Sequence, residues 1–363
     1  MGKGFTLSIY PWVYMGKYKS GNIWDEKFIE KEHLTPAEEA ELQPEEANAL
    51  LAKRNSFPDL PLVNYTTQYG MGCFEGLKAF PQKDGKLKLF RPDENAKRMA
   101  RSMAGLKMPP FPEKIFTEAV LSLVRKNKSI GFAPEYDKAW EKDFFDSGHS
   151  IYIRPFSYSE PAIGLGLSHY PWVVMISTPV GSYFQPGNNK AVTTDKARAF
   201  PGGTGWIKCD SNYVIPTLVK KEAESKGYME AIFLDAANKE FIEEGSSCNI
   251  FFLLNNGVLV TPDTGDTVLK GINRMSVLDL AGDSGIKTEE RRISINEVMS
   301  EAKEAFVTGT AAGVTFIESI THNGKTRELN GCKIGEVTET LGRRLRGIKY
   351  GAEEDIFNWM FEV

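Results

Sequence analysis

Short apolar runs separated by turn residues make up much of the chain, and this pattern limits the folds that it can adopt. Such runs occur at Ile151–Ile153, Trp172–Ser177, Ala231–Leu234, Asn249–Leu254, Val258–Thr261 and Ala305–Val307. Runs of this length favour strands, whereas a helix needs about 10 residues or more. Asn255-Asn256-Gly257 lies between two of the runs and is typical of a hairpin turn. Because strands and helices do not alternate regularly, the pattern predicts a mixed α/β fold with many hairpins.

Helical periodicity is confined to a few segments. Thr35-Pro36-Ala37-Glu38 has the N-cap, first-turn proline and acidic residue of a helix start, and it predicts a helix that runs to about Arg54. A second helix is predicted at Pro92–Gly105, on which Arg98 either pairs with Glu94 or contacts a ligand. A third is predicted at Tyr213–Gly227, with apolar residues on one face: Ile215, Leu218, Val219 and Ala223.

Chain length and one loop predict the domain organisation. At roughly 100–200 residues per domain, a chain of 363 residues suggests two domains. The stretch near residues 181–191 is rich in Gly and Asn and is the best candidate for a linker. We therefore predict a small N-terminal α/β domain over residues 1–180, an interdomain loop over 181–191 and a large C-terminal domain over 192–363.

Charge and composition argue against several kinds of partner. A balance of 44 basic against 48 acidic residues gives no electrostatic reason to expect nucleic acid. Residues 161–189 carry no charged side chain, but prolines interrupt them, so they predict a buried strand and a neutral loop rather than a membrane span. The N-terminus lacks the apolar stretch of a signal peptide, which predicts a cytoplasmic location. The four His and four Cys show no metal-ligand spacing, so neither a zinc site nor a disulfide framework is predicted.

The densest chemical signal is the glycine-rich segment Pro201–Lys208. Its three glycines allow a close approach of the backbone, and a lysine follows at once. The spacing is not that of a phosphate-binding P-loop, because Cys209 stands where that motif has Ser or Thr. A lysine packed against such a loop loses solvation, which lowers its pKa and suits it to a Schiff base with a carbonyl cofactor. An ordinary surface lysine is the alternative at this point.

Four further segments supply groups that such chemistry needs. Glu243–Asn249 places a carboxylate at a strand end, and Thr308–Ala312 is a small-residue turn whose backbone N–H groups can bind an anion. Lys270–Arg274 opens a helix, where free N–H groups favour phosphate. Tyr152 and Arg154 are two residues apart in a predicted strand and therefore share a face, on which both can meet one carboxylate. Together these parts match the needs of a pyridoxal phosphate enzyme that acts on an amino acid.

Several segments of the chain resemble a known family. The segments that carry the resemblance are Tyr69–Phe80, Leu89–Met99, Tyr152–Pro155, Gly202–Tyr213, Glu244–Asn249, Lys270–Arg274 and Thr308–Ala312, in this order. They are similar to the branched-chain amino acid aminotransferases, which are class IV, fold-type IV pyridoxal phosphate enzymes. The likeness covers about Pro61 to Val363. It implies two α/β domains, of which the C-terminal one binds the cofactor at the domain interface.

The resemblance also implies how the cofactor is held. Lys208 would bind pyridoxal 5'-phosphate covalently and then move the proton, and Glu244 rather than Glu243 would face the pyridine nitrogen. Tyr213 would hydrogen-bond the ring oxygen. The other implied cofactor contacts are Arg98, Ser246, Ile272, Asn273 and Thr310. One departure is that Asp210 and Ser211 stand where the family often has two glycines.

For the substrate, the resemblance implies that the carboxylate meets the Thr310 and Ala311 amides, helped by Tyr152 and Arg154. The apolar wall of the pocket would be formed by Tyr69, Phe74, Tyr152 and Tyr183. A second subunit of a homodimer would lend Ile163 and Leu165. The implied reaction moves the amino group of leucine, isoleucine or valine to 2-oxoglutarate, giving glutamate and a 2-oxo acid. Alternatives are a D-amino acid aminotransferase or aminodeoxychorismate lyase of the same class, and a non-enzymatic nucleotide-binding module.

Overall fold

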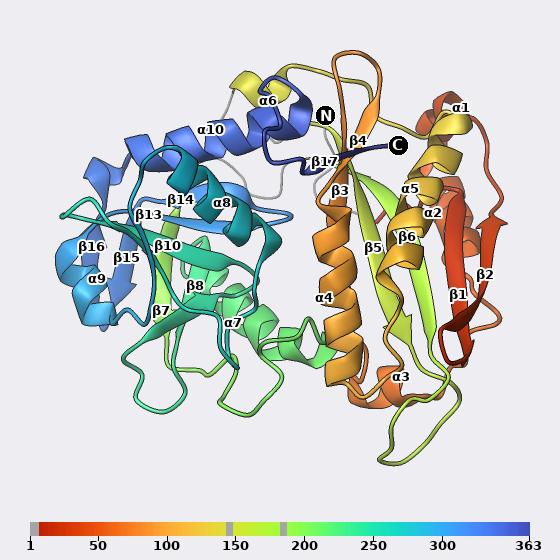
Figure 1. Ribbon diagram of the computed structural model, residues 1–363, viewed down its shortest axis with the longest axis horizontal. Coiled ribbons are helices and arrows are strands. Elements are labelled where there is room, and N and C mark those ends of the chain that lie inside the picture. The colour runs from red at the N-terminus through yellow and green to blue at the C-terminus, as the bar shows by residue number, and fades with distance from the viewer. Residues whose placement is uncertain (1–6, 143–147, 182–186) are drawn as a thin grey trace.

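A computed structural model describes residues 7–142, 148–181 and 187–363, and its strands form three sheets within these ranges. Figure 1 shows one large sheet on one side of the molecule and two further sheets, with their helices, on the other. The mixed α/β class predicted from the sequence is confirmed. No helix in the described ranges is both long and apolar enough to cross a bilayer.

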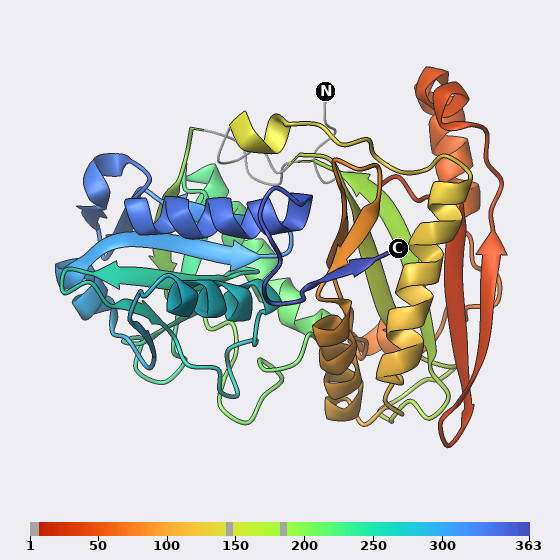
Figure 2. The same ribbon diagram turned by 45° about the horizontal axis from the view of Figure 1, so that its top comes forward.

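The first sheet has seven strands in the order β17-β4-β3-β5-β6-β1-β2, and all neighbours are antiparallel. These strands are β1 (Trp12–Ser20), β2 (Ile23–Glu30), β3 (Leu77–Pro81), β4 (Leu87–Phe90), β5 (Ser150–Tyr158), β6 (Trp172–Val180) and β17 (Met360–Glu362). Helices α4 (Pro92–Gly105) and α5 (Glu113–Ser129) cover one face, where Met99, Phe116 and Leu123 pack against the sheet in one core. The end of the chain returns to this sheet as β17 (Figure 2).

The other two sheets have five strands each and face one another across a second core. One has the order β12-β11-β10-β13-β14, made of β10 (Asn249–Leu254), β11 (Leu259–Thr261), β12 (Thr288–Glu290), β13 (Ala302–Gly309) and β14 (Gly313–Ile317). The other has the order β16-β15-β7-β8-β9, made of β7 (Lys190–Thr194), β8 (Glu230–Leu234), β9 (Ile242–Gly245), β15 (Ser319–His322) and β16 (Lys325–Glu328). Ile232, Ile250 and Val307 belong to the core that both sheets share.

Helices cover the outer faces of this pair of sheets (Figure 1). α8 (Ile272–Asp283) and α10 (Glu336–Tyr350) pack on Phe251 and Phe306, and α7 (Val214–Ser225) packs on Ala231 and Phe233. The remaining short elements are α1 (Pro36–Glu41), α2 (Pro44–Arg54), α3 (Tyr65–Tyr69), α6 (Ala139–Lys142), α9 (Ile295–Glu301) and the 3-10 turns η1 (Asp210–Tyr213) and η2 (Asn330–Cys332). The division of the chain into domains at residues 181–191 stays a prediction.

The single helix predicted from Thr35 to Arg54 is wrong, because two helices occupy this segment. The predicted capping box at Thr35 and Glu38 is present. However, Gln43 precedes Pro44 and has an extended backbone, with φ −66° and ψ 154°. A residue before proline is pushed out of the helical region, so Gln43 cannot continue the first helix, which ends at Glu41, and Pro44 begins the next.

The predictions for the other helices differ in outcome. The helix at Pro92–Gly105 is confirmed as α4, and the Asn255–Gly257 turn joins β10 to β11 with Gly257 at φ 81°. The helix predicted at Tyr213–Gly227 begins with η1 and continues as α7. On α7 only Val219 and Ala223 of the predicted apolar face are buried, whereas Ile215 and Leu218 are exposed. Helical spacing predicts which residues share a face, but not how much of that face a sheet covers.

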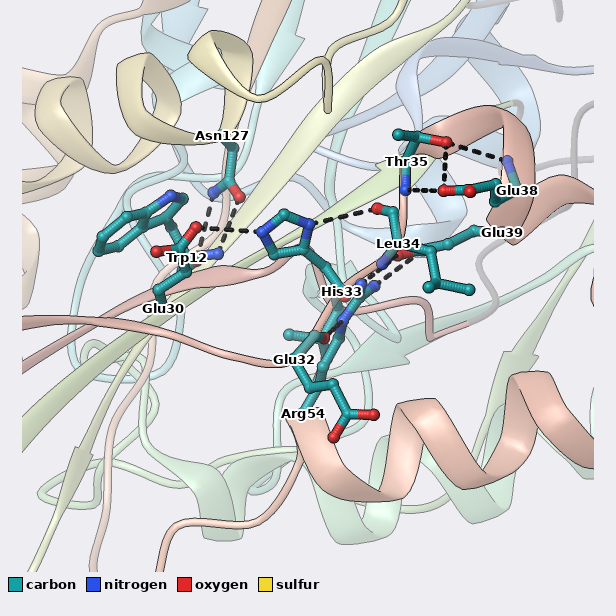
Figure 3. Close-up of polar contacts among 11 residues, drawn as sticks. Trp12, Glu30, Glu32, His33, Leu34, Thr35, Glu38, Glu39, Arg54 and Asn127 are labelled. Carbon is teal, nitrogen blue, oxygen red and sulfur yellow. Dashed lines mark hydrogen bonds and ion pairs between the residues drawn. The ribbon is translucent and has the colours of Figure 1, made fainter.

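A buried ion pair ties α1 and α2 to the edge of the first sheet (Figure 3). The Arg54 guanidinium is buried and forms an ion pair with the Glu39 carboxylate, where one contact is 3.0 Å long. Arg54 also donates to the carbonyl oxygens of Ile9 (3.0 Å) and Glu32 (3.0 Å). These contacts join α1 and α2 to the segment before β1 and to the segment after β2.

This pair makes stability depend on Glu39. Glu39→Gln leaves the buried guanidinium without its counter-charge, and we expect a loss of about 2–3 kcal/mol in the free energy of unfolding. Urea unfolding followed by circular dichroism measures the change. Glu41→Gln, an exposed change on the same helix, is the matched control. A Glu39→Gln midpoint equal to that of the control would contradict the prediction.

Candidate active site

A cavity of about 760 Å³ is lined by residues from the first sheet and from the half of the chain that forms the other two sheets. Phe74, Tyr152 and Arg154 line it from the first-sheet side, and Lys208, Tyr213, Ser246, Thr310 and Ala311 from the other. A narrower cavity of about 50 Å³ shares Lys208, Tyr213, Ser246 and Thr310 with it. The narrow cavity adds four more of the predicted residues, which are Arg98, Glu244, Ile272 and Asn273. We call the first the wide cavity and the second the narrow cavity.

Lys208 lines both cavities. Its Nζ donates a 2.6 Å hydrogen bond to the Tyr213 hydroxyl and lies 4.7 Å from the centre of the Phe74 ring. Burial lowers the pKa of Lys208 to about 8, and the nearby Arg98 cation acts in the same direction. A larger fraction of the amine is therefore uncharged near neutral pH than for an exposed lysine, which suits a nucleophile or a base.

The glycine-rich segment before Lys208 packs closely against its neighbours. A Cβ on Gly205 would lie 2.7 Å from the Ala199 side chain and 2.8 Å from the Asp266 carbonyl oxygen, so only glycine fits there. At the other end, the Lys208 carbonyl accepts a 3.1 Å hydrogen bond from the Phe74 N–H. The lysine is thus held between a tight loop and the segment that leads into β3.

Glu244 lies at the narrow cavity and Glu243 does not line it, because neighbouring strand residues point to opposite faces. The Glu244 carboxylate is paired with the Arg198 guanidinium and accepts a 3.1 Å hydrogen bond from the Leu269 N–H. Burial raises the pKa of Glu244, while the Arg198 cation acts against that shift. Arg198 was missed from the sequence, since one arginine ahead of a glycine-rich segment carries no recognisable signal.

Arg98 pairs with Glu75 and not with Glu94, which corrects the ion pair considered from the sequence. Its Nε and Nη2 donate to the two Glu75 oxygens at 2.7 Å and 2.8 Å, and Nη1 donates to the Lys270 carbonyl at 3.3 Å. Glu94 instead pairs with Lys97 at 2.8 Å. Arg98 also lines the narrow cavity, so the pair and the ligand contact are compatible.

The narrow cavity ends at the N-terminus of α8, and its groups suit a phosphate ester. No side chain caps this helix, so the N–H groups of its first turn are available, and Ile272 and Asn273 line the cavity. The Ser246 and Thr308 hydroxyls line the same space and are buried without a hydrogen-bond partner among the described residues. Buried hydroxyls normally have partners, so these two indicate an absent acceptor. The donors therefore fit the phosphate of the predicted cofactor.

The wide cavity combines aromatic surface with cationic charge. Arg154 donates to the Tyr152 hydroxyl at 3.2 Å from Nε and 2.9 Å from Nη2, and its guanidinium lies 4.4 Å from the centre of the Phe74 ring. Asp210, noted from the sequence only as a departure, also lines this cavity. Burial raises the pKa of Asp210 to about 6, with Arg154 opposing the shift, so the carboxyl is ionised above that pH.

Three predicted substrate residues line neither the wide nor the narrow cavity. Ile163 and Leu165 are 83% and 94% exposed, and neither lines either cavity. Tyr69 lies beside them, because its hydroxyl accepts a 3.1 Å hydrogen bond from the Gly164 N–H. Tyr183 lies outside the described residues. Within those residues no group of three or more His, Cys, Asp or Glu is placed to hold a metal ion.

Comparisons with known proteins bear on this site. Residues 72–320 match the family described as amino-transferase class IV. The branched-chain-amino-acid transaminase 1 of Bacillus subtilis (strain 168) is 37% identical over 305 residues, which cover 81% of this chain and 82% of that protein. The branched-chain aminotransferase of Thermoproteus uzoniensis, solved with norvaline, is 29% identical with a TM-score of 0.70, over 84% of this chain and 94% of that one.

A further solved structure contains a cofactor derivative. It is a branched-chain amino acid aminotransferase from the organism abbreviated T.th., complexed with N-(5'-phosphopyridoxyl)-L-glutamate. It is 26% identical with a TM-score of 0.67, over 84% of this chain and 92% of that one.

The lowered pKa of Lys208 leads to a pH prediction. The fraction of neutral amine, and with it the rate of modification by an amine-directed reagent, should rise through about pH 8 rather than through the usual 10.5. Arg98→Met should move this midpoint upward, because it removes a cation and leaves the Glu75 carboxylate unpaired. Mass spectrometry of the peptide that contains Lys208 measures both midpoints. Arg101→Met, an exposed change on the same helix, should leave the midpoint near 8, and a midpoint near 10.5 in the unchanged protein would contradict the prediction.

Proposed function

The chain belongs to the class IV aminotransferases and, within them, to the branched-chain amino acid aminotransferases, and we propose that it transfers the amino group of leucine, isoleucine or valine to 2-oxoglutarate with pyridoxal 5'-phosphate as cofactor. One observation carries this proposal. The Lys208 amine lies where a narrow cavity with free anion donors meets a wide cavity with aromatic and cationic walls. A phosphate ester, an amine and an amino acid can thus meet at one point.

The residues of the narrow cavity would hold the cofactor. When bound, pyridoxal phosphate supplies an aldehyde carbon that condenses with amines and a ring that accepts electrons. Arg98, the first turn of α8, Ser246 and Thr308 would bind its phosphate. The Glu244 carboxylate would hold a proton on the ring nitrogen, and Tyr213 would donate to the ring oxygen. Arg198 holds Glu244 in place through their ion pair, and its cation opposes the rise in the Glu244 pKa that burial causes.

Lys208 would move the proton in each half-reaction. With a substrate and the cofactor bound, the Lys208 amine, which donates to the Tyr213 hydroxyl in this structure, would take a proton from the substrate Cα. The same amine would deliver that proton to the C4' carbon of the cofactor. A base works best when its pKa lies near the working pH, and the value of about 8 for Lys208 meets this condition.

The wide cavity would select the substrates. The Thr310 and Ala311 amides, with Tyr152 and Arg154, would bind the carboxylate of the amino acid. Phe74 lies beneath the Arg154 guanidinium, so the wall beside this carboxylate site offers an apolar face to a branched side chain.

We further propose that the enzyme is a homodimer. Tyr69, Ile163 and Leu165 gather on the surface instead of lining the cavity, and Leu62 is exposed on the segment next to them. Contiguous exposed apolar residues mark an interaction surface. A second copy would cover them and would bring Ile163 and Leu165 to its neighbour's cavity. The cytoplasmic location remains a prediction from the sequence.

Lys208→Ala tests the proposed chemistry directly. We expect loss of the visible absorbance of the lysine-bound cofactor and a fall in activity of about 1,000-fold or more, because the proton carrier is gone. Absorption spectra and a leucine plus 2-oxoglutarate assay measure the two effects. Lys97→Ala, a surface change on α4, should leave both unchanged. A fully active Lys208→Ala protein, or turnover of D-alanine without turnover of L-leucine, would refute the proposed function.

Leu165→Asp tests the homodimer. A buried aspartate on the proposed contact should give a monomer by light scattering and a strong loss of activity, since each site would lose the residues lent by its partner. Ile23→Asp is the matched control, because Ile23 is also an exposed apolar residue but lies on the β1–β2 hairpin. An unchanged protein that is monomeric and active would contradict the proposal.

A further inference from the structure

Two buried lysines have no part in the chemistry proposed above. Lys78 on β3 and Lys349 on α10 are 4% and 6% exposed. They line a third cavity of only about 10 Å³, together with Asn95, Asn273 and Thr310. Lys349 donates a 3.2 Å hydrogen bond to the Asn273 side-chain oxygen, and its Nζ lies 4.4 Å from the centre of the Phe90 ring. Within the described residues neither lysine forms an ion pair with a carboxylate.

Burying two such groups is unfavourable for the protein alone. Burial lowers the pKa of Lys78 to about 8. It lowers the pKa of Lys349 far below its usual value, and the Lys78 and Arg346 cations add to this effect. An unpaired charge inside a protein is strongly unfavourable, and an apolar side chain of similar volume is usually as good or better there. An anion close to Lys78 and Lys349 would offset the cost of burying them.

The third cavity lies directly behind the narrow cavity. Ile272, Asn273 and Thr310 line both, so they form the wall between the lysines and the α8 N-terminus. Asn273 is fixed on both sides of this wall, because its Nδ2 donates to the Gly309 carbonyl at 2.6 Å while its Oδ1 accepts from Lys349. A space of about 10 Å³ holds no more than one water molecule. The missing anion would therefore bind beyond a wall of the third cavity. This cavity shares Gly76 and Thr310 with the wide cavity, but Asn273, the hydrogen-bond partner of Lys349, lines only the narrow one of the two, which favours the narrow cavity.

The charges that line the narrow cavity and the third cavity also favour an anion in the narrow cavity. Arg98 is matched by Glu75 and Arg198 by Glu244, so neither arginine adds net charge to the site. The helix N-terminus, Ser246 and Thr308 are neutral donors. A phosphate monoester carries a charge of about −1.5 to −2 at neutral pH. Apart from Lys208, whose amine would be joined to the cofactor, Lys78 and Lys349 are the unmatched cations that line these two cavities in the described chain. Together they can balance the phosphate charge.

We propose that Lys78 and Lys349 form a second cationic layer behind the phosphate end of the cofactor site, and that their charges raise the affinity for the phosphorylated cofactor through the Asn273 wall. Both are positioning residues, since neither lines the narrow cavity itself. The inference rests on the proposed function, because it assumes that pyridoxal phosphate is the ligand.

The sign of the pH effect follows from the ligand-free protein. A bound phosphate favours the ammonium form of each lysine and raises its pKa. Below about pH 8, Lys78 is already charged, so its contribution to affinity does not change with pH. Above that pH, binding must take up a proton at Lys78, and affinity falls by up to about tenfold per pH unit. The pKa of Lys349 is also lowered, by burial and then by the Lys78 and Arg346 cations, so Lys349 in its neutral form takes up a proton on binding as well. Other charged or titratable groups around the pair are Arg346 on α10, Tyr152 opposite Lys78 on β5, and the Glu75–Arg98 pair, which Asn95 joins.

The test compares two cofactor forms. Dissociation constants of pyridoxal phosphate and of pyridoxal, which lacks the phosphate, are measured on the full-length protein from about pH 7 to about pH 9.5. Both ligands form the same bond to Lys208, and their different aldehyde chemistry in solution is the same for every variant, so the change in the ratio of their affinities between variants isolates the phosphate. In Lys78→Met and in Lys349→Met we expect this ratio to fall about tenfold, which corresponds to one buried charge interaction. Lys349→Arg, which keeps the charge, and the surface variant Lys97→Met should retain the ratio.

Two further readouts separate an electrostatic role from a structural one. The ratio for the unchanged protein should fall above about pH 8, and it should be flatter with pH in the methionine variants. Ligand-free methionine variants should unfold at the same or a higher temperature, because a buried unpaired charge has been removed.

Equal losses of affinity for pyridoxal phosphate and for pyridoxal, or an unchanged ratio of the two affinities, would overturn the inference. Should Lys349→Met fail to fold, Lys78→Met and Lys349→Gln decide the question. If the unchanged protein bound no pyridoxal phosphate, the proposed function itself would fail.

Discussion

The ion pair between Arg98 and Glu75 connects the parts of the molecule on which the site depends. Its two contacts of 2.7 Å and 2.8 Å join α4 to the segment before β3, and the remaining Arg98 nitrogen reaches the Lys270 carbonyl just before α8. Asn95 adds a third donor to Glu75 at 2.7 Å. The first sheet is thereby fixed against the helix whose first turn lines the narrow cavity. The same pair has an electrostatic consequence, because an arginine matched by a carboxylate would position the proposed phosphate without balancing its charge. Under the proposed function, other cations would have to supply that balance.

Close approach of backbone segments sets the geometry around this pair. A Cβ on Gly76 would lie 2.2 Å from the Tyr152 hydroxyl, so glycine there keeps Tyr152 at the cavity wall beside Arg154. The Phe74 N–H binds the Lys208 carbonyl, which places the reactive amine next to the first sheet although the lysine follows a loop of the other half. The site is therefore formed by the contact between the two halves and does not belong to either alone. Desolvation at this contact lowers the pKa of Lys208, so position and reactivity have one cause.

The parts of the fold and of the site that depend on local sequence patterns could be predicted from the sequence. The Gly-rich segment before Lys208, the strand-end Glu244 and the start of α8 follow from turn and helix signals, and α4 was predicted with its bounds. The helix from Thr35 to Arg54 failed on one local feature, the proline at position 44. Other residues were missed because their partners are distant in sequence. Glu75 lies 23 residues from Arg98, and Lys349 lies 76 residues from Asn273, so only the folded chain brings them together. The exposed Ile215 and Leu218 show the limit of periodicity, which does not indicate whether a neighbour covers a face.

The charges around the site indicate that the protein and its cofactor form one electrostatic unit. Arg98 and Arg198 each have a carboxylate within the chain, which holds them in position without a ligand. Lys78 and Lys349 have none among the described residues, and the Ser246 and Thr308 hydroxyls lack acceptors there. A ligand that binds only the folded state stabilises it by mass action. A phosphate at the α8 N-terminus would satisfy both kinds of unmatched group at once. The groups that destabilise the ligand-free protein would then be the groups that strengthen phosphate binding. A substitution that stabilises the ligand-free protein by removing one of them should therefore lower the affinity for the phosphate.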